Sequence, residues 1–189
     1  MKQDEKLEHL LDKVIEDTEQ KQMTKDEYRY ISSFLGNKNV LVFGTGYDSD
    51  LWRYANQNGK TIFLEHNSSW ITNFQDTYHI IYTSNLRRDK HILLEQYKQG
   101  DYSGLEIDMP DEVKNTAWDL ILVDSPEGGK KKHYHGRMQS IFTAKKLARK
   151  NTDIFVHDCD RKVEDLYTKE FFGEPKKQLT KLRHFVYEK

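Results

Sequence analysis

The chain has 189 residues, and its 30 Lys and Arg against 31 Asp and Glu give a net charge of −1, which excludes a strongly basic nucleic-acid surface or a polybasic membrane anchor. Its aromatic content of 12% favours a packed core over disorder, its single cysteine, Cys159, cannot form an internal disulfide, and no apolar run reaches the roughly 18 residues of a membrane span. These features predict a soluble, cytoplasmic single domain over 1–189 with no nucleic-acid partner and no membrane anchor.

The first 38 residues carry two helical patterns and no motif that suggests chemistry. Apolar residues recur at helical spacing over 7–15, within a strongly charged segment, which predicts an amphipathic helix. A second helix is predicted to begin after Thr24, because Thr24 and Glu27 have the spacing of a capping box. Residues 1–38 are therefore predicted to form a helical cover over a core of residues 39–189.

Short apolar runs alternate with helical stretches over the rest of the chain. The runs predict strands at 40–43, 61–64, 78–82, 120–123, 154–156 and 182–187. Helices are predicted at 51–55, 68–74, 91–97, 138–149 and 161–172. The stretch 86–117 has the weakest pattern and is predicted to be a loop-rich insertion over one end of the sheet. Apolar strands that alternate with helices predict an α/β fold, with a parallel sheet covered on both faces.

The first predicted strand ends in the turn Gly44-Thr45-Gly46 and is followed by a helix. Ligands in such sheets bind beyond the carboxyl ends of the strands, and a turn with two glycines lets the backbone approach a ligand closely. Glu65 ends the next strand, where a carboxylate can accept hydrogen bonds from both hydroxyls of a ribose. The alternative is that the glycines serve only a tight turn.

The candidate cofactors are an NAD-type dinucleotide and S-adenosylmethionine. A dinucleotide site favours a third glycine where this chain has Ser49, and Asp48 would bring negative charge towards a pyrophosphate. S-adenosylmethionine has no phosphate and carries a sulfonium and an ammonium, so a nearby acid favours it. The predicted S-adenosylmethionine site consists of Gly44, Thr45, Gly46, Asp48, Ser49 and Glu65.

Acidic and histidine side chains follow two strands that are predicted to be neighbours. Asp124 ends one run, and His157 and Asp158 end the next, so these three candidate catalytic residues are expected to converge. A carboxylate or an imidazole can take the proton of an acceptor hydroxyl. Asp124, Asp158 and Asp160 also offer oxygen ligands for Mg or Mn, and a histidine widens the choice to Co or Zn. Alternatively, Asp158 or Asp160 caps the following helix and His157 is an interior histidine.

A basic stretch, Lys130-Lys131-Lys132-His133-Tyr134-His135-Gly136-Arg137, follows Asp124. In a chain of near-neutral charge it predicts an anionic or sugar-like substrate, although the lysines could equally form a solvated surface. Arg137 is predicted to pair with a substrate carboxylate as a bidentate fork. His135 and Arg161 complete the predicted substrate site.

A series of sequence blocks carries a family resemblance. In chain order they are VLVFGTGYDSDLW (40–52), TIFLE (61–65), YHIIYT (78–83), WDLILVDSP (118–126), GRMQSIFTA (136–144), TDIFVHDCDRKVE (152–164) and LRHF (182–185). Together they resemble the plant glucuronoxylan 4-O-methyltransferase family, which includes the irregular-xylem-15-like proteins. The blocks span 39–185, and GRM together with HDxDR is the most specific pair.

The resemblance implies a Rossmann-like class I methyltransferase fold, S-adenosylmethionine as donor, and stimulation by a divalent metal (Mg, Mn or Co). It implies a carbohydrate hydroxyl as acceptor, which in plants is position 4 of glucuronic acid on xylan. By position it implies cofactor contacts at Gly44, Gly46, Asp48 and Glu65. It implies an active site of Asp124, Arg137, His157, Asp158, Asp160 and Arg161.

Two departures from the plant pattern shape the expectation. The plant N-terminal membrane anchor is missing, which predicts a cytoplasmic protein, or one in a host cytoplasm if the source is a virus. The region before WDLI is reduced to 86–117, and its length is expected to affect the acceptor site. The sequence predicts a sugar O-methyltransferase. The alternatives are methylation of a phenolic or other small metabolite and a non-catalytic glycan-assembly protein that keeps the fold.

Overall fold

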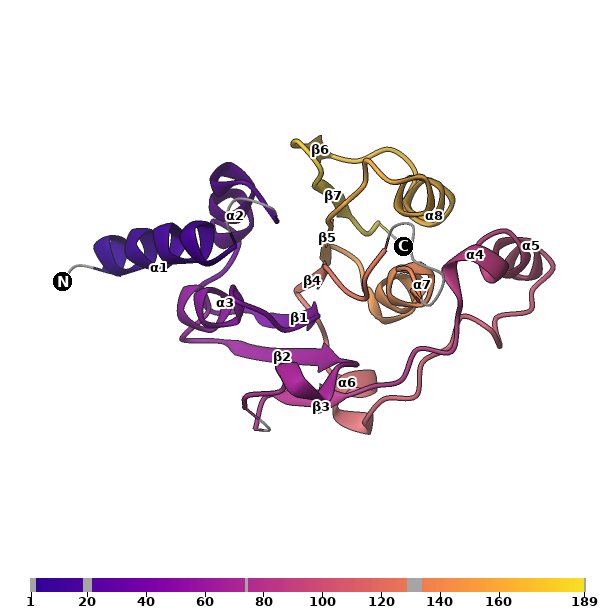
Figure 1. Ribbon diagram of the computed structural model, residues 1–189, viewed down its shortest axis with the longest axis horizontal. Coiled ribbons are helices and arrows are strands. Elements are labelled where there is room, and N and C mark those ends of the chain that lie inside the picture. Colours follow the sequence, from indigo (N-terminus) through magenta and orange to yellow (C-terminus); the bar gives the residue numbers. More distant parts are fainter. Residues whose placement is uncertain (1–2, 19–21, 74, 129–133, 189) are drawn as a thin grey trace.

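The computed structural model describes residues 3–18, 22–73, 75–128 and 134–188, which form one seven-stranded sheet between two layers of helices (Figure 1). The strands are β1 (Asn39–Phe43), β2 (Lys60–Glu65), β3 (Thr77–His79), β4 (Leu120–Val123), β5 (Asp153–Val156), β6 (Lys177–Gln178) and β7 (Arg183–Val186). The helices are α1 (Gln3–Asp17), α2 (Lys25–Ser32), α3 (Ser49–Ala55), α4 (Leu86–Asp89), α5 (Ile92–Lys98), α6 (Asp111–Asn115), α7 (Met138–Leu147) and α8 (Lys162–Phe172), with a 3-10 turn η1 (Ser68–Trp70).

The strand order in the sheet is β3-β2-β1-β4-β5-β7-β6. Strands β1 to β5 are parallel, whereas β7 is antiparallel to both β5 and β6. The predicted parallel sheet is found over β1 to β5, and the antiparallel edge adds to it; the link between β6 and β7 is too short for a crossover, so these two strands form a hairpin. The order reverses at β1, which lies between β2 and β4, and this switch point is where such sheets bind ligands.

Alternate residues of the central strands point into two separate cores, as the period of a strand requires. Val40 and Val42 pack under α1, α2 and α3, whereas Leu41 and Phe43 pack with the helices of the opposite layer. Figure 1 shows α1, α2 and α3 together on one side of the sheet and α7 and α8 on the other. No helix in the described ranges combines the length and the apolarity needed to cross a membrane.

Helix α2 confirms the predicted capping box and gives it a second task. The Thr24 side chain accepts a hydrogen bond from the Glu27 amide, and the Glu27 carboxylate accepts one from the Thr24 amide. Glu27 is fully buried, and its other oxygen accepts hydrogen bonds from the amides of Lys181 and Leu182. The cap of α2 therefore also fixes the turn that leads into β7.

The segment after β2 is less helical than predicted. Only the single turn η1 forms, and its cap is Asn67, whose side chain accepts a hydrogen bond from the Ser69 amide. Trp70 is exposed and Ile71 is buried, so their apolar spacing does not mark one face of a longer helix. Phe74, which was expected on that helix, lies outside the described residues. Strand β3 likewise ends at His79, earlier than predicted.

The stretch 86–117 was wrongly predicted to be a loop-rich insertion. It contains α4, α5 and α6, and Leu93, Leu105 and Val113 are buried in the main core. Helix α5 confirms the helix predicted at 91–97, whereas α4 and α6, of 4 and 5 residues, are too short to display a helical repeat. The stretch is part of one helical layer.

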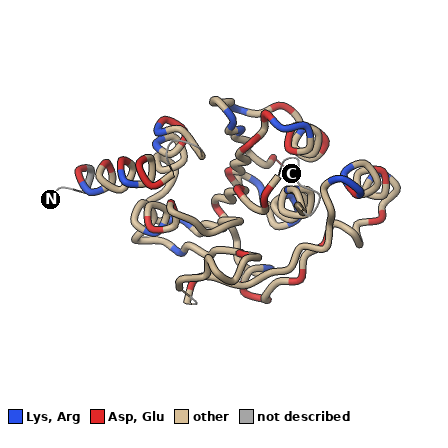
Figure 2. Tube along the Cα trace, viewed as in Figure 1, with Lys and Arg blue, Asp and Glu red and all other residues tan. Residues whose placement is uncertain are grey.

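Acidic and basic residues are interspersed along the described chain, without a large region of one sign (Figure 2).

Candidate active site

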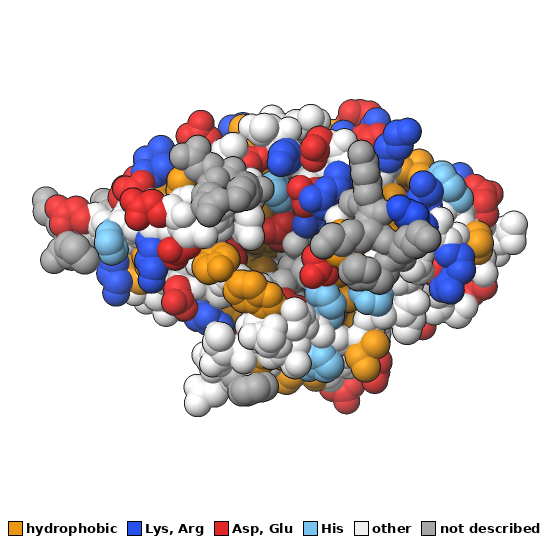
Figure 3. Space-filling view, viewed as in Figure 1, with side chains coloured by type: hydrophobic (Ala, Val, Ile, Leu, Met, Phe, Trp, Pro, Cys, Tyr) orange, Lys and Arg blue, Asp and Glu red, His pale blue; other side chains and the backbone are white. Residues whose placement is uncertain are grey.

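A cavity of about 370 Å³ opens at the carboxyl ends of the central strands, a size typical of small-molecule sites. Most of its lining comes from the segments that follow β1, β2, β4 and β5. The space-filling view shows this hollow near the middle of the face, with acidic side chains in its depth and hydrophobic side chains along one border (Figure 3). The cavity therefore lies at the switch point of the sheet.

The turn after β1 forms one wall of the cavity. Gly44 has a φ of +109°, and a Cβ atom there would lie 2.8 Å from the Cβ of Ser125, so only glycine fits. Gly46 has no such strain, and its amide donates a hydrogen bond to the Ser49 hydroxyl at 2.9 Å. Position 44 therefore needs glycine because of its positive φ and because Ser125, after β4, lies against it. The same turn also lines the cavity.

Glu65 ends β2 and is 3% exposed. Its Oε2 accepts hydrogen bonds from the Thr45 amide at 2.8 Å and the Thr45 hydroxyl at 3.1 Å, and its Oε1 accepts one from the Asn67 amide at 2.7 Å. Burial alone would raise the pKa of Glu65, but the contacts with His66, Asn67 and Thr45 outweigh burial and lower it. The lowered pKa favours the ionised carboxylate. A ligand that donates hydrogen bonds to Glu65 would compete with the groups that now donate to its oxygens.

His66 bridges two carboxylates across the cavity. Its Nδ1 lies 3.0 Å from Oε1 of Glu65, and its Nε2 lies 3.0 Å from Oε2 of Glu127, in the segment after β4. The contact with Glu127, followed by that with Glu65, raises the pKa of His66 to about 9. His66 was missed in the sequence, although its position next to Glu65 was a signal. Glu127 gave no such signal.

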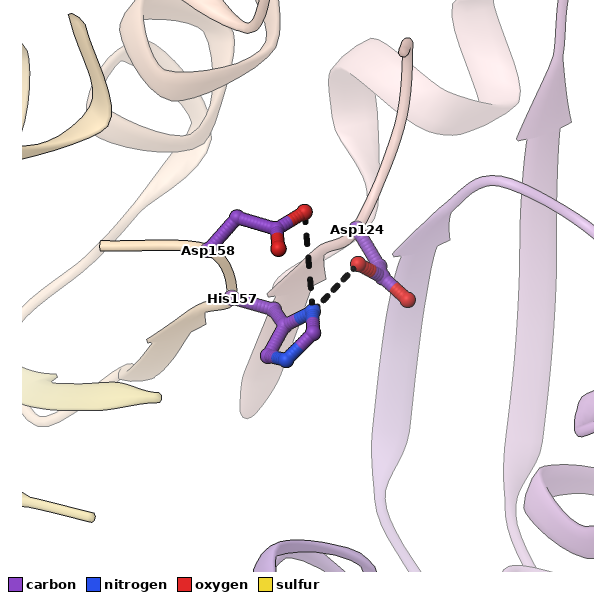
Figure 4. Close-up of side chains that lie close together, drawn as sticks. All are labelled: Asp124, His157 and Asp158. Atoms are coloured by element: carbon purple, nitrogen blue, oxygen red, sulfur yellow. Dashed lines mark hydrogen bonds and ion pairs between the residues drawn. The ribbon is translucent and has the colours of Figure 1, made fainter. Parts of the chain in front are cut away.

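Three of the predicted catalytic side chains converge at the ends of β4 and β5, as expected for neighbouring strands. The Nδ1 of His157 lies 3.0 Å from Oδ1 of Asp124 and 3.7 Å from Oδ2 of Asp158 (Figure 4). One possible ligand atom from each residue lies within 4.8 Å of the others. The Nε2 atom of His157 is buried and has no hydrogen-bond partner within the described part of the chain.

Arg137, predicted to contact the substrate, lies beside this group, 4% exposed, at the lining of the cavity. Its guanidinium donates hydrogen bonds to the carbonyl oxygens of Pro126, His157 and Asp124, at 3.2, 2.7 and 2.8 Å. One terminal nitrogen also lies 3.0 Å from the Asp124 carboxylate and 2.7 Å from that of Asp158. Arg137 therefore joins the ends of β4 and β5 from inside.

The buried charges of the group shift one another's protonation. Burial would raise the pKa of Asp124, but His157 and Arg137 outweigh it and hold that pKa below its ordinary value. Burial would lower the pKa of His157, but Asp124 outweighs it and raises that pKa. Asp48, on the other side of the cavity, differs: burial and the charge of Asp124 raise its pKa to about 7.

The chain turns sharply after β5, and this turn separates Asp158 from Asp160. Asp158 has a φ of +60°, unusual for a residue other than glycine. Arg161 lies 2.9 Å from the Asp158 carboxylate, lines the cavity and is 37% exposed. Asp160 points to solvent and is not brought into the group. Neither aspartate caps α8, whose N-cap position is Arg161.

His135, the other predicted substrate residue, lies next to the cavity and is not part of its lining. The His135 Nδ1 lies 2.7 Å from the Ser84 carbonyl oxygen, and its ring packs near His66 and Tyr82, behind the cavity lining. The lysines 130–132 and His133 lie outside the described residues. Tyr47 and Trp70 line the cavity and were not predicted as site residues; Trp70 had been placed on a helix predicted over 68–74.

The strand order with β7 reversed, the glycine turn after β1 and the acid that ends β2 define a class I S-adenosylmethionine-dependent methyltransferase fold. Within that class, the chain belongs to the IRX15/IRX15L/GXM family, whose model matches residues 27–185.

Similar proteins include several from Arabidopsis thaliana. Glucuronoxylan 4-O-methyltransferase 1 is 37% identical, over 87% of this chain and 67% of the relative. Arabinogalactan O-methyltransferase 1 is 35% identical, over 72% of this chain and 55% of the relative. The chain thus spans about two thirds or less of these relatives' lengths. The solved MycE methyltransferase from the mycinamycin biosynthetic pathway aligns with a TM-score of 0.47 and 13% identity, over 96% of this chain and 48% of that one.

Proposed function

We propose that this chain is an S-adenosylmethionine-dependent O-methyltransferase that methylates a hydroxyl of a glycan. The observation that carries the proposal is the Asp124–His157 pair, which lies in the same cavity as the glycine turn and Glu65. The names of the relatives, glucuronoxylan and arabinogalactan O-methyltransferases, support the reaction and the acceptor class. Membership of the family supports carrying both to this chain.

The cofactor is proposed to lie along the turn after β1, with its ribose on Glu65. The ribose hydroxyls would take over acceptor positions that the Thr45 hydroxyl and His66 use in this structure. Asp48 lines the cavity beyond the turn and would face the cationic methionine end. Because burial and Asp124 raise the pKa of Asp48 to about 7, a cation beside it would favour its ionised form.

The proposed reaction transfers the methyl group from the sulfonium to the acceptor oxygen. The S–C bond breaks as the O–C bond forms, and the hydroxyl proton passes to the Asp124–His157 pair, leaving S-adenosylhomocysteine and a methyl ether. Asp124 is the more accessible member, with its side chain 20% exposed against 4% for His157. The carboxylate would therefore contact the hydroxyl and the imidazole would share the proton, so the pair titrates as one unit.

A divalent cation forms the second, finer part of the proposal. Two carboxylates and an imidazole, from Asp124, Asp158 and His157, are a suitable donor set for Mg, Mn or Co. Such an ion, when bound, would lower the pKa of an acceptor hydroxyl. Arg137 and Arg161 already balance the two carboxylates, so binding is expected to be weak. Calorimetric titration with Mn should give a signal that Asp158→Asn abolishes and that the exposed control Asp160→Asn keeps.

Incubation of the purified protein with S-adenosylmethionine and a panel of acceptors tests the main proposal. Mass spectrometry should find methyl groups on oligosaccharides of glucuronoxylan or arabinogalactan, in step with S-adenosylhomocysteine formation. Methylation of phenolic metabolites alone would replace the acceptor class. The relatives Protein IRX15-LIKE and Protein IRREGULAR XYLEM 15 have names that state no activity, and binding of S-adenosylhomocysteine without turnover of any acceptor would favour a non-catalytic scaffold.

A further inference from the structure

Two exposed aromatic side chains lie next to each other on the cavity rim. Tyr47 is 51% exposed and Trp70 is 39% exposed, and both line the cavity. Their ring centroids are 5.4 Å apart and their planes meet at 76°. Single exposed hydrophobic residues are common, but an adjacent aromatic pair at the mouth of a cavity marks a contact surface.

The backbone that carries this aromatic pair is anchored. Tyr47 follows Gly46 directly, and Trp70 ends η1. The Thr45 hydroxyl donates a hydrogen bond to the Trp70 carbonyl oxygen at 3.0 Å, which connects η1 to the glycine turn. Asn67 accepts hydrogen bonds from both the amide and the hydroxyl of Ser69, at 3.1 and 2.8 Å. Ordering the two rings on a ligand would therefore cost little additional backbone entropy.

The size of the cavity indicates what lies against the rim. A volume of about 370 Å³ accommodates one molecule of the cofactor's size and cannot also enclose a polymer. A polymeric acceptor must then cross the rim, with only the reacting unit inside. A pyranose ring presents a flat face of C–H groups, and the face of an aromatic ring is its natural partner.

We infer that Tyr47 and Trp70 form a stacking platform for a sugar ring of the acceptor, next to the unit that is methylated. This inference rests on the proposed function, because a glycan must be the acceptor. In an edge-to-face pair, the edge of one ring contacts one face of the other ring. The remaining aromatic surface is accessible, because both residues are exposed. The platform determines acceptor affinity and takes no part in the transfer itself. Stacking on the adenine of the cofactor is the competing role.

Three alanine variants test the platform: Trp70→Ala, Tyr47→Ala and the control Tyr102→Ala. Tyr102 is 45% exposed and lies beside Tyr97 and Phe142, outside the lining of this cavity. Calorimetry would measure S-adenosylhomocysteine binding, and then oligosaccharide binding to the protein saturated with it. We expect Trp70→Ala to weaken oligosaccharide binding about tenfold and Tyr47→Ala somewhat less, with the S-adenosylhomocysteine Kd changed by less than about twofold. Trp70→Phe should restore most of the loss.

The two proposals fail in different ways. A loss of S-adenosylhomocysteine affinity in Trp70→Ala, with oligosaccharide binding unchanged, would assign the pair to the cofactor and overturn the inference. Unchanged oligosaccharide affinity in both platform variants, or an equal loss in Tyr102→Ala, would also overturn it. Because the binding measurement needs no turnover, a wild-type protein that binds oligosaccharides without methylating them would refute the proposed function and leave the platform standing.

Discussion

The two halves of the cavity hold their acids in different ways. On the β1–β2 side, Glu65 is surrounded by backbone amides, a hydroxyl and His66, all from segments beside it. On the β4–β5 side, Asp124 and Asp158 share the buried guanidinium of Arg137. Single hydrogen bonds to Glu65 can be exchanged for those of a ligand, whereas loss of the guanidinium would remove an ion-pair partner from two carboxylates, of which that of Asp158 is buried. One half is suited to exchanging partners and the other to keeping its geometry.

Removing Arg137 should break this contrast most severely. Arg137→Gln leaves two carboxylates and three carbonyl oxygens short of a donor, and we expect it to lower the free energy of unfolding by about 3–5 kcal/mol. Arg161→Gln removes the same charge from a side chain that is 37% exposed, and should cost less than about 1 kcal/mol. Urea unfolding compares the two variants. Equal stabilities would show that the buried guanidinium is not what holds this half together.

Substitutions in the Asp124–His157 pair are expected to give the next largest effect, which is on turnover and not on stability. Asp124→Asn or His157→Ala should lower kcat by about 10²- to 10⁴-fold, because the pair takes the hydroxyl proton. S-adenosylhomocysteine binding should stay near the wild-type value, since its proposed contacts lie in the other half. Asp160→Asn, a change at an exposed neighbour, should leave both quantities unaltered. A full rate in both pair variants would move the base elsewhere.

A substitution of Glu65 tests the β1–β2 side of the cavity, where hydrogen-bond partners can be exchanged. Glu65→Gln should weaken S-adenosylhomocysteine binding by about 1.5–3 kcal/mol, or roughly ten- to hundredfold, because the amide replaces one of the two accepting oxygens by a donor and removes the charge. Glu127→Gln, which removes the other carboxylate that contacts His66, should have a smaller effect. Calorimetry on both variants measures the difference. Loss of equal size in both would show that His66, and not Glu65, determines affinity.

The smallest expected effect is a pH dependence from His66. Contacts with Glu127 and Glu65 raise the pKa of His66 from 6.5 to about 9, so folding favours the protonated ring. The stabilisation is complete below about pH 6.5 and is lost as the pH rises through 9. We expect about 1 kcal/mol, because Glu127 is largely exposed to solvent. Urea unfolding at pH 6 and pH 9.5 should show a decrease in the wild type that is smaller in His66→Gln, and parallel decreases would contradict the bridge.

The same contrast explains how much could be predicted from the sequence. Apolar runs located the central strands, and the parallel arrangement then brought Asp124 next to His157 and Asp158. The capping box at Thr24 is local, so it too was visible. In 86–117 the helix predicted at 91–97 was found as α5, whereas α4 and α6, of 4 and 5 residues, were missed because each is too short to show a helical repeat.

Contacts between segments far apart in the chain limited how much of the site could be predicted from the sequence. Arg137 was predicted to contact a substrate because it follows Gly136 at the start of a helix, and nothing local showed that its partners include carbonyl oxygens at the ends of two strands. Asp160 was grouped with Asp158 by proximity in sequence. Asp158 has a left-handed backbone and Asp160 is exposed to solvent, and a sequence pattern does not display such a conformation.

The three carbonyl contacts of Arg137 also have a consequence for local opening. Pro126 and Asp124 follow β4, and His157 follows β5, so one side chain connects the ends of two strands. Neither end can fray without breaking bonds to the other, and the two ends should open as one cooperative unit. In hydrogen exchange, the amides of Asp124 and His157, which bond to Phe43 and Val123, are then expected to exchange together, more slowly than the amides of the exposed turn η1.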